Sequence, residues 1–196
     1  MLIDIVVYDG LDEMDALGPL EVLRSASRNA DISVRLVTRE PQDVVTGAYG
    51  LRFMPDGVYQ PGEAQIVIVA GGGWAARAER GAWGEVQRGA WLPLLQQARS
   101  TADVLAGVCT GTMLLAHAGI VGRRRASTHH TAWDDLAATG ATLVKDRVVD
   151  DGDLVTSGGV TSGIDLALWL VEREFSPQLA EQVATRMEYA RQRPST

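Results

Sequence analysis

A single cysteine stands where a strand is expected to give way to a helix. Cys109 lies in the segment Gly-Val-Cys-Thr-Gly, residues 107–111, after the apolar run 104–108 and before an apolar stretch that ends at Ala118. A nucleophile flanked in this way by two glycines is typical of a sharp elbow, because the turn leaves no room for side chains at the glycine positions. The helix N-terminus below the sulfur predicts a lowered thiol pKa. The alternative is that Cys109 is a small buried hydrophobic residue.

A thiolate nucleophile needs an acid or a base close by. Four carboxylates follow the first apolar run, at Asp9, Asp12, Glu13 and Asp15. His129 and His130 form the only adjacent histidine pair, whereas His117 falls on the helix expected after Cys109 and is interpreted as an ordinary helix residue. Residues 71–73 are three glycines after another apolar run, and they could offer backbone N–H groups to a developing anion. Composition alone does not choose among these candidates.

The elements that must position these residues alternate along the chain. Strands are predicted at residues 2–8, 32–37, 65–70 and 104–108, and helices at 14–27, 90–99, 111–118, 163–174 and 177–191. The Gly- and Pro-rich stretch 44–59 suggests short strands, and the acidic turn 150–153 predicts a hairpin. The alternation predicts one α/β domain over residues 1–196, a mostly parallel sheet with helices on both faces. Loops that follow parallel strands share one edge of the sheet, so the early carboxylates can reach Cys109.

Composition and charge narrow the classes of function. The chain has 196 residues, a formal net charge of −7 and a pI near 4.9, which argues against a general nucleic-acid binder. The triple arginine 123–125 is therefore interpreted as a solvated turn. We expect no membrane span, no signal peptide and a cytoplasmic location, the last because a lone cysteine suits a reducing compartment. The histidines and the cysteine lack metal-ligand spacing, so no metal is predicted.

Five segments resemble the DJ-1/PfpI superfamily in order and spacing. They are residues 14–23, 70–73, 107–119, 126–130 and 156–165. Within the superfamily, the Asp-x-x-Gly-Pro-x-Glu-Val start, the Cys-Thr pair and the Gly-Gly-Val-x-x-Gly-Ile-Asp segment look most like the isonitrile hydratase branch. The amidase-like domains of certain transcription regulators share much of this pattern, but they carry a C-terminal DNA-binding region for which this chain is expected to end too early. The resemblance implies a flavodoxin-like three-layer sandwich, usually a homodimer.

The resemblance also implies roles for individual residues. Cys109 would be the nucleophile, Asp15 would handle the proton, and Thr110 would help through its hydroxyl or its N–H group. Further groups that would contact the substrate are Gly72, Gly73 and His129. The implied reaction needs no cofactor: the thiolate attacks an isonitrile carbon, water attacks the thioimidate, and an N-substituted formamide leaves. Two alternatives stay open, namely a cysteine hydrolase or glyoxalase-like enzyme, and a redox sensor or protective protein that uses Cys109 oxidation.

Overall fold

A seven-stranded sheet forms the centre of the protein in the computed structural model, which describes residues 1–194. The strand order is β10-β11-β7-β6-β1-β2-β5, and every pair is parallel except β10–β11. The strands of this sheet are β1 (Leu2–Val6), β2 (Ser33–Thr38), β5 (Gly57–Val58), β6 (Ile66–Val69), β7 (Val104–Gly107), β10 (Val148–Asp150) and β11 (Leu154–Ser157). Two small sheets pair β3 (Val45–Thr46) with β4 (Arg52–Phe53), and β8 (Arg125–Ala126) with β9 (Thr142–Leu143).

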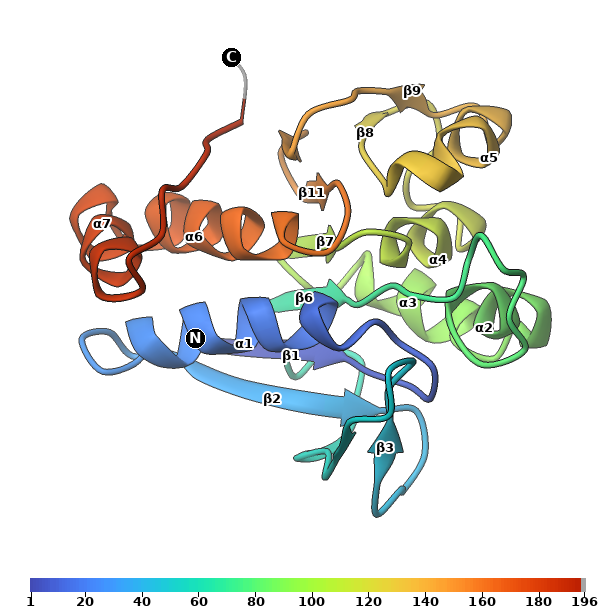
Figure 1. The fold of residues 1–196 in the computed structure, drawn as a ribbon, viewed down its shortest axis with the longest axis horizontal. Helices are drawn as coiled ribbons and strands as arrows, with labels where there is room; N and C mark the ends of the chain where they lie inside the picture. The colour runs from blue at the N-terminus through green and yellow to red at the C-terminus, as the bar shows by residue number, and fades with distance from the viewer. Residues whose placement is uncertain (195–196) are drawn as a thin grey trace.

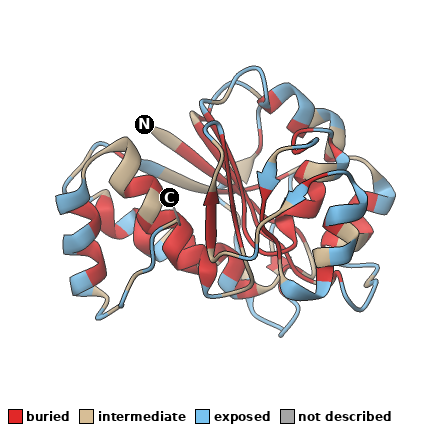
Figure 2. Cartoon of the chain, turned by 90° about the horizontal axis from the view of Figure 1, so that it is seen from above, coloured by how far each residue is buried: buried red, intermediate tan, exposed pale blue. Residues whose placement is uncertain are grey.

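Helices cover both faces of the central sheet (Figure 1). One face carries α1 (Glu13–Ala26), α6 (Ser162–Glu174) and α7 (Pro177–Arg186), which pack against one another. The other face carries α2 (Ala82–Arg88), α3 (Leu92–Ala98) and α4 (Gly111–His117). A short 3-10 turn (His130–Ala132) and α5 (Trp133–Ala138) lie with the β8–β9 pair. Figure 2 shows buried strands between two helical layers, which confirms the three-layer α/β sandwich.

The apolar runs of the sequence form the inner strands because both faces of those strands are covered. All four residues of β6 and all four of β7 are buried. A charged exception is Asp4, which is fully buried in β1 and lies opposite Arg35 of β2 in the parallel register. The Arg35 guanidinium donates two hydrogen bonds to the Asp4 carboxylate, at 2.8 and 2.9 Å, so this buried charge is paired.

Several predicted elements are confirmed and others were missed. The hairpin around residues 150–153 is formed by β10 and β11, and residues 44–59 contain short strands as expected. Helix α2 was missed because it is only seven residues long and contains Gly84, which lowers its helix propensity. Gly84 is nevertheless required, since a Cβ there would lie 1.7 Å from the Glu79 carbonyl oxygen. The elements α5, β8 and β9 were also missed, and the last helix ends at Arg186 instead of residue 191.

The buried apolar side chains form one continuous cluster on both sides of the sheet. This cluster includes residues of α1, α4 and α6, the three helices that begin at the carboxyl edge of the sheet. The starts of α1 and α4 are therefore fixed against the same core. Among residues 1–194, no helix combines the length and the apolar character that a membrane crossing requires.

Candidate active site

Cys109 occupies a tight elbow between β7 and α4. Its φ of +55° lies in the left-handed region, which is uncommon for a residue other than glycine. Two hydrogen bonds fix this backbone: the Cys109 N–H donates to the Gly158 carbonyl at 3.1 Å, and the Thr128 hydroxyl donates to the Cys109 carbonyl at 2.9 Å. A Cβ at Gly111 would lie 2.0 Å from the Val69 carbonyl oxygen, so the elbow tolerates no side chain there. The geometry matches the nucleophile elbow that the glycine spacing predicts.

The first turn of α1 brings Asp15 to Cys109. Asp15 is fully buried, and it lies close enough to Cys109 for each side chain to shift the pKa of the other. Its Oδ2 accepts the Gly71 N–H at 3.1 Å, whereas its Oδ1 has no partner within the described part of the chain. Glu13 points elsewhere and accepts N–H groups from the loop at Tyr49. Of the acids considered in the sequence, Asp15 is therefore the one that meets the cysteine.

Burial and nearby negative charge raise the pKa values of both Cys109 and Asp15. Burial is the main cause that raises the pKa of Cys109 well above its ordinary value, and the Asp15 charge adds to it. Hydrogen bonds from the N–H groups of Val160 and Thr110 act in the opposite direction but are outweighed. Burial likewise raises the pKa of Asp15, with Asp12 as the second cause. The expectation of a low thiol pKa is therefore wrong, because burial and the Asp15 charge outweigh the local N–H groups.

The glycine turn after β6, residues 71–73, is hydrogen-bonded both to the start of α1 and to the elbow. The Asp12 N–H donates to the Gly71 carbonyl at 2.9 Å, and the Gly72 N–H donates to the Thr110 hydroxyl oxygen at 2.8 Å. The Gly73 N–H has no partner among residues 1–194, and Gly73 lines the same cavity as Cys109. Gly72 therefore has no N–H left to offer a substrate. Gly73 is retained as the candidate donor, and Thr110 acts here through its contact with Gly72.

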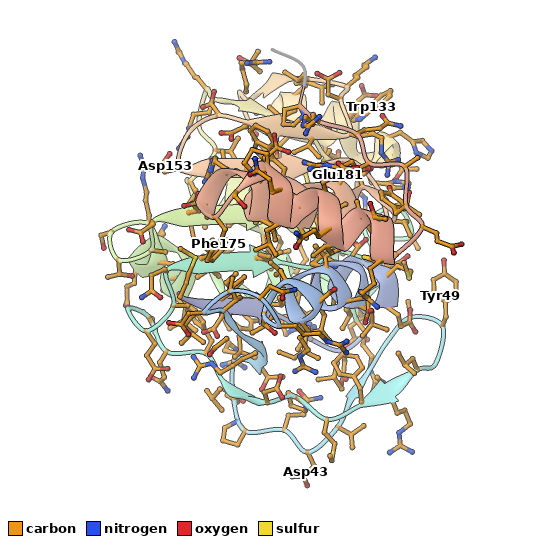
Figure 3. The ribbon with its side chains drawn as sticks, turned by 90° about the vertical axis from the view of Figure 1, so that its left-hand side faces the viewer. Asp43, Tyr49, Trp133, Asp153, Phe175 and Glu181 are labelled. Carbon is orange, nitrogen blue, oxygen red and sulfur yellow. The ribbon has the colours of Figure 1, made fainter. Side chains whose placement is uncertain are left out.

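A cavity of about 270 Å³ opens beside Cys109. Much of its wall is apolar, and the polar part comes mainly from the elbow and from the segment around His129. Tyr49 closes one side from the β3–β4 loop, and Figure 3 shows its side chain projecting away from the ribbon. Asp15 does not line the cavity and lies behind Cys109. The lining residues are Asp12, Tyr49, Gly72, Gly73, Trp74, Ala75, Ala76, Cys109, Thr110, His129, Thr131 and Val160.

His129 belongs to the cavity wall, as the sequence suggested, but it is arranged as a hydrogen-bond donor. Its Nδ1 accepts the Thr131 N–H at 3.3 Å and lies 2.8 Å from the Thr131 hydroxyl, so the ring proton belongs on Nε2. Burial lowers the pKa of His129, with neighbouring His130 as the second cause. The ring is therefore neutral near pH 7. His117 is a helix residue, as expected, and its Nδ1 bonds the Met113 carbonyl.

Several wall residues were missed in the sequence, and two of them, Val160 and Trp74, make contacts that shape the site. Val160 has a φ of +46°, a strained conformation for a β-branched residue, and its N–H is one of the two that contact the Cys109 side chain. Trp74 is almost fully buried, and its indole N–H donates to Asp135 of α5 at 2.6 Å. Val160 belongs to the Gly-Gly-Val segment of the family resemblance, but its role, like that of Trp74, depends on segments that are distant along the chain. In the part of the chain described by the structure, no three His, Cys, Asp or Glu side chains gather as metal ligands.

Comparisons with known proteins identify the family and agree with the fold. The DJ-1/PfpI family profile matches residues 1–173. The isonitrile hydratase of Pseudomonas putida is 33% identical over 188 residues, which covers 96% of this chain and 78% of that enzyme. The HTH-type transcriptional regulator CdhR of Pseudomonas aeruginosa is 32% identical over 193 residues, or 96% of this chain and 55% of the regulator. A ThiJ/PfpI family crystal structure from Pseudomonas syringae superimposes with a TM-score of 0.87 at 26% identity, covering 100% of this chain and 77% of that one. The chain belongs to the DJ-1/PfpI family.

Proposed function

We propose that this protein is an isonitrile hydratase that converts an isonitrile and water into an N-substituted formamide. The observation that carries the proposal is the buried Cys109–Asp15 pair behind a small cavity with a largely apolar wall. An isonitrile presents a slim carbon terminus on an apolar group, and both parts suit this space. The similarity to the Pseudomonas putida enzyme supports the same reaction.

In the first step that we propose, Cys109 and Asp15 share one proton. The reactive form carries this proton on Asp15 and leaves Cys109 as the thiolate. The Asp15 proton moves to the terminal carbon while the Cys109 sulfur bonds to that carbon, which gives the thioimidate R–N=CH–S–Cys and an Asp15 carboxylate. Asp15 lies behind the sulfur, so the carbon reaches the proton only when it is seated against Cys109. This seating excludes bulk water from the acid.

The second step hydrolyses the thioimidate. The Asp15 carboxylate takes one proton from a water molecule as the water oxygen bonds to carbon. The remaining hydroxyl proton ends on nitrogen as the carbon–sulfur bond breaks, so the formamide R–NH–CHO leaves and the thiolate and protonated acid are restored. The unpaired Gly73 N–H and the Nε2–H of His129 are the candidate donors to the charge that develops on nitrogen and oxygen.

The proposal includes a homodimer in the cytoplasm. The exposed large apolar side chains of the described residues are Met14, Tyr49, Leu51 and Met54. Three of them line a second cavity, of about 350 Å³, which shares Asp12, Tyr49 and Val160 with the active-site cavity. Exposed apolar surface of this kind favours protein contact, and family members are often dimers. We propose that a second copy of the chain covers this surface. The cytoplasmic location rests on a separate observation, the lone buried thiol, which suits a reducing compartment.

The proposal is tested by measuring formamide production from alkyl and aryl isonitriles. Cys109→Ser should abolish turnover, and Asp15→Asn should lower kcat by about 10²–10⁴, the usual contribution of general acid–base catalysis. Asp12→Asn is the matched control, because Asp12 caps the helix that carries Asp15 and lines the cavity without bonding the thiol. It should keep kcat within about tenfold of wild type.

Parallel assays with amides and 2-oxoaldehydes separate the alternatives. Turnover of these compounds without turnover of any isonitrile would replace the hydratase proposal with a hydrolase or glyoxalase-like activity. Loss of activity in Asp12→Asn equal to the loss in Asp15→Asn would show that the wrong carboxylate has been assigned. Oxidation of Cys109 at low peroxide in a protein that turns over none of these substrates would favour a redox sensor.

A further inference from the structure

One peptide group links a buried tyrosine to the acid of the active site. The Tyr8 hydroxyl, just beyond β1, donates to the Ala70 carbonyl at 2.5 Å. The N–H on the other side of that same peptide bond belongs to Gly71, and it donates to Asp15 Oδ2 at 3.1 Å. The result is an unbroken chain from the Tyr8 hydroxyl through the Ala70–Gly71 peptide to the Asp15 carboxylate.

We propose that Tyr8 is a positioning residue that tunes the acidity of Asp15 through the Ala70–Gly71 peptide. The proposal deepens and rests on the proposed function, in which Asp15 must give a proton to carbon and then take one from water. A hydroxyl that bonds the carbonyl polarises the peptide and makes its N–H a stronger donor. A stronger donor stabilises the carboxylate form of Asp15, and therefore helps the acid to release its proton.

Burial makes the hydrogen-bonded link between Tyr8 and Asp15 effective. Tyr8 is 4% exposed and Asp15 is fully buried, so solvent does not compete for these hydrogen bonds. The titratable groups that face Tyr8 are Asp15, Glu85 and Cys109, and those that face Asp15 are Cys109 and Asp12. Burial raises the pKa of Tyr8 well above its ordinary value, so the hydroxyl keeps its proton and remains a donor across the working pH range.

Tyr8→Phe removes the hydroxyl and keeps the ring. With a weaker Gly71 donor, the shared proton is held more tightly by Asp15 and less by Cys109. Cooperativity strengthens a charge-assisted hydrogen bond by about 10–30%. Its loss changes the ratio of the two protonation forms, proton on Asp15 against proton on Cys109, by a factor on the order of threefold. We therefore expect Cys109 to react faster with iodoacetamide at neutral pH, by up to that factor. The kcat for isonitrile hydration should change by less than that factor, because the larger thiolate fraction offsets the weaker acidity of Asp15.

Two controls distinguish a specific effect on the acidity of Asp15 from a general disturbance of the structure. Tyr59→Phe removes the hydroxyl of another buried tyrosine, whose ring packs against Trp91 away from the pair, and it should change neither alkylation nor hydration. In an Asp15→Asn background, Tyr8→Phe should no longer alter the alkylation rate. The proposal is overturned if Tyr8→Phe leaves the rate of Cys109 alkylation unchanged, if it slows alkylation and hydration together, or if its effect persists without the Asp15 carboxyl. Because alkylation needs no isonitrile, this arm gives a result even if the hydratase proposal fails.

Discussion

The elbow at Cys109 can be tested by adding one methyl group. In Gly111→Ala the new Cβ would lie 2.0 Å from the Val69 carbonyl oxygen and 2.8 Å from the Ala70 carbonyl oxygen. Real Cβ contacts essentially never fall below 3.0 Å, so the end of β6 must move by about 1 Å. Overpacking against backbone of this kind costs about 3 kcal/mol of unfolding free energy, which corresponds to a fall in Tm of roughly 6–12 °C for a domain of this size.

Denaturant unfolding followed by circular dichroism gives the change in unfolding free energy, and iodoacetamide alkylation reports whether Cys109 is still presented correctly. Gly57→Ala is the matched control, because its new Cβ would have nothing within 4 Å and its φ is not in the left-handed region. It should change the unfolding free energy by no more than about 0.5 kcal/mol. A Gly111→Ala protein as stable as wild type, with unchanged alkylation, would refute the steric reasoning.

Three further predictions concern the site and its surface. Asp15→Asn removes the negative charge that raises the pKa of Cys109, so the pH profile of Cys109 alkylation should shift to lower pH. The rate of isonitrile hydration should fall in the same variant. A shift of the alkylation profile to higher pH would contradict the proposed shared proton. In Gly159→Ala the new Cβ would lie 2.1 Å from Cδ2 of His129, so the ring must turn away. Activity should then fall by about tenfold, the value of one hydrogen bond, and complete loss would show that His129 is essential. Sedimentation should give roughly twice the 21.0 kDa chain mass, and Tyr49→Glu should return it to the monomer; a monomeric wild type would remove the dimer proposal.

The sequence by itself determined the main strands and the elbow at Cys109. Each of these is encoded locally: the strand cores at residues 66–69 and 104–107 are continuous apolar runs, and the elbow needs glycines at fixed distances from Cys109. Helix α2 was not predicted, because it is short and contains Gly84, which lowers the local propensity but is required by packing against Glu79.

Only the tertiary structure decided how the groups around Cys109 act. The sequence predicted a lowered thiol pKa from a local feature, the helix N-terminus, but burial and the charge of Asp15 depend on the packing of α1 against the elbow and outweigh it. The same holds for Gly72, whose N–H is donated to Thr110 from another loop. The link between Tyr8 and Asp15 likewise passes through the Ala70–Gly71 peptide of a different strand end. Local sequence specifies which groups are present, and long-range packing sets their solvation, partners and protons.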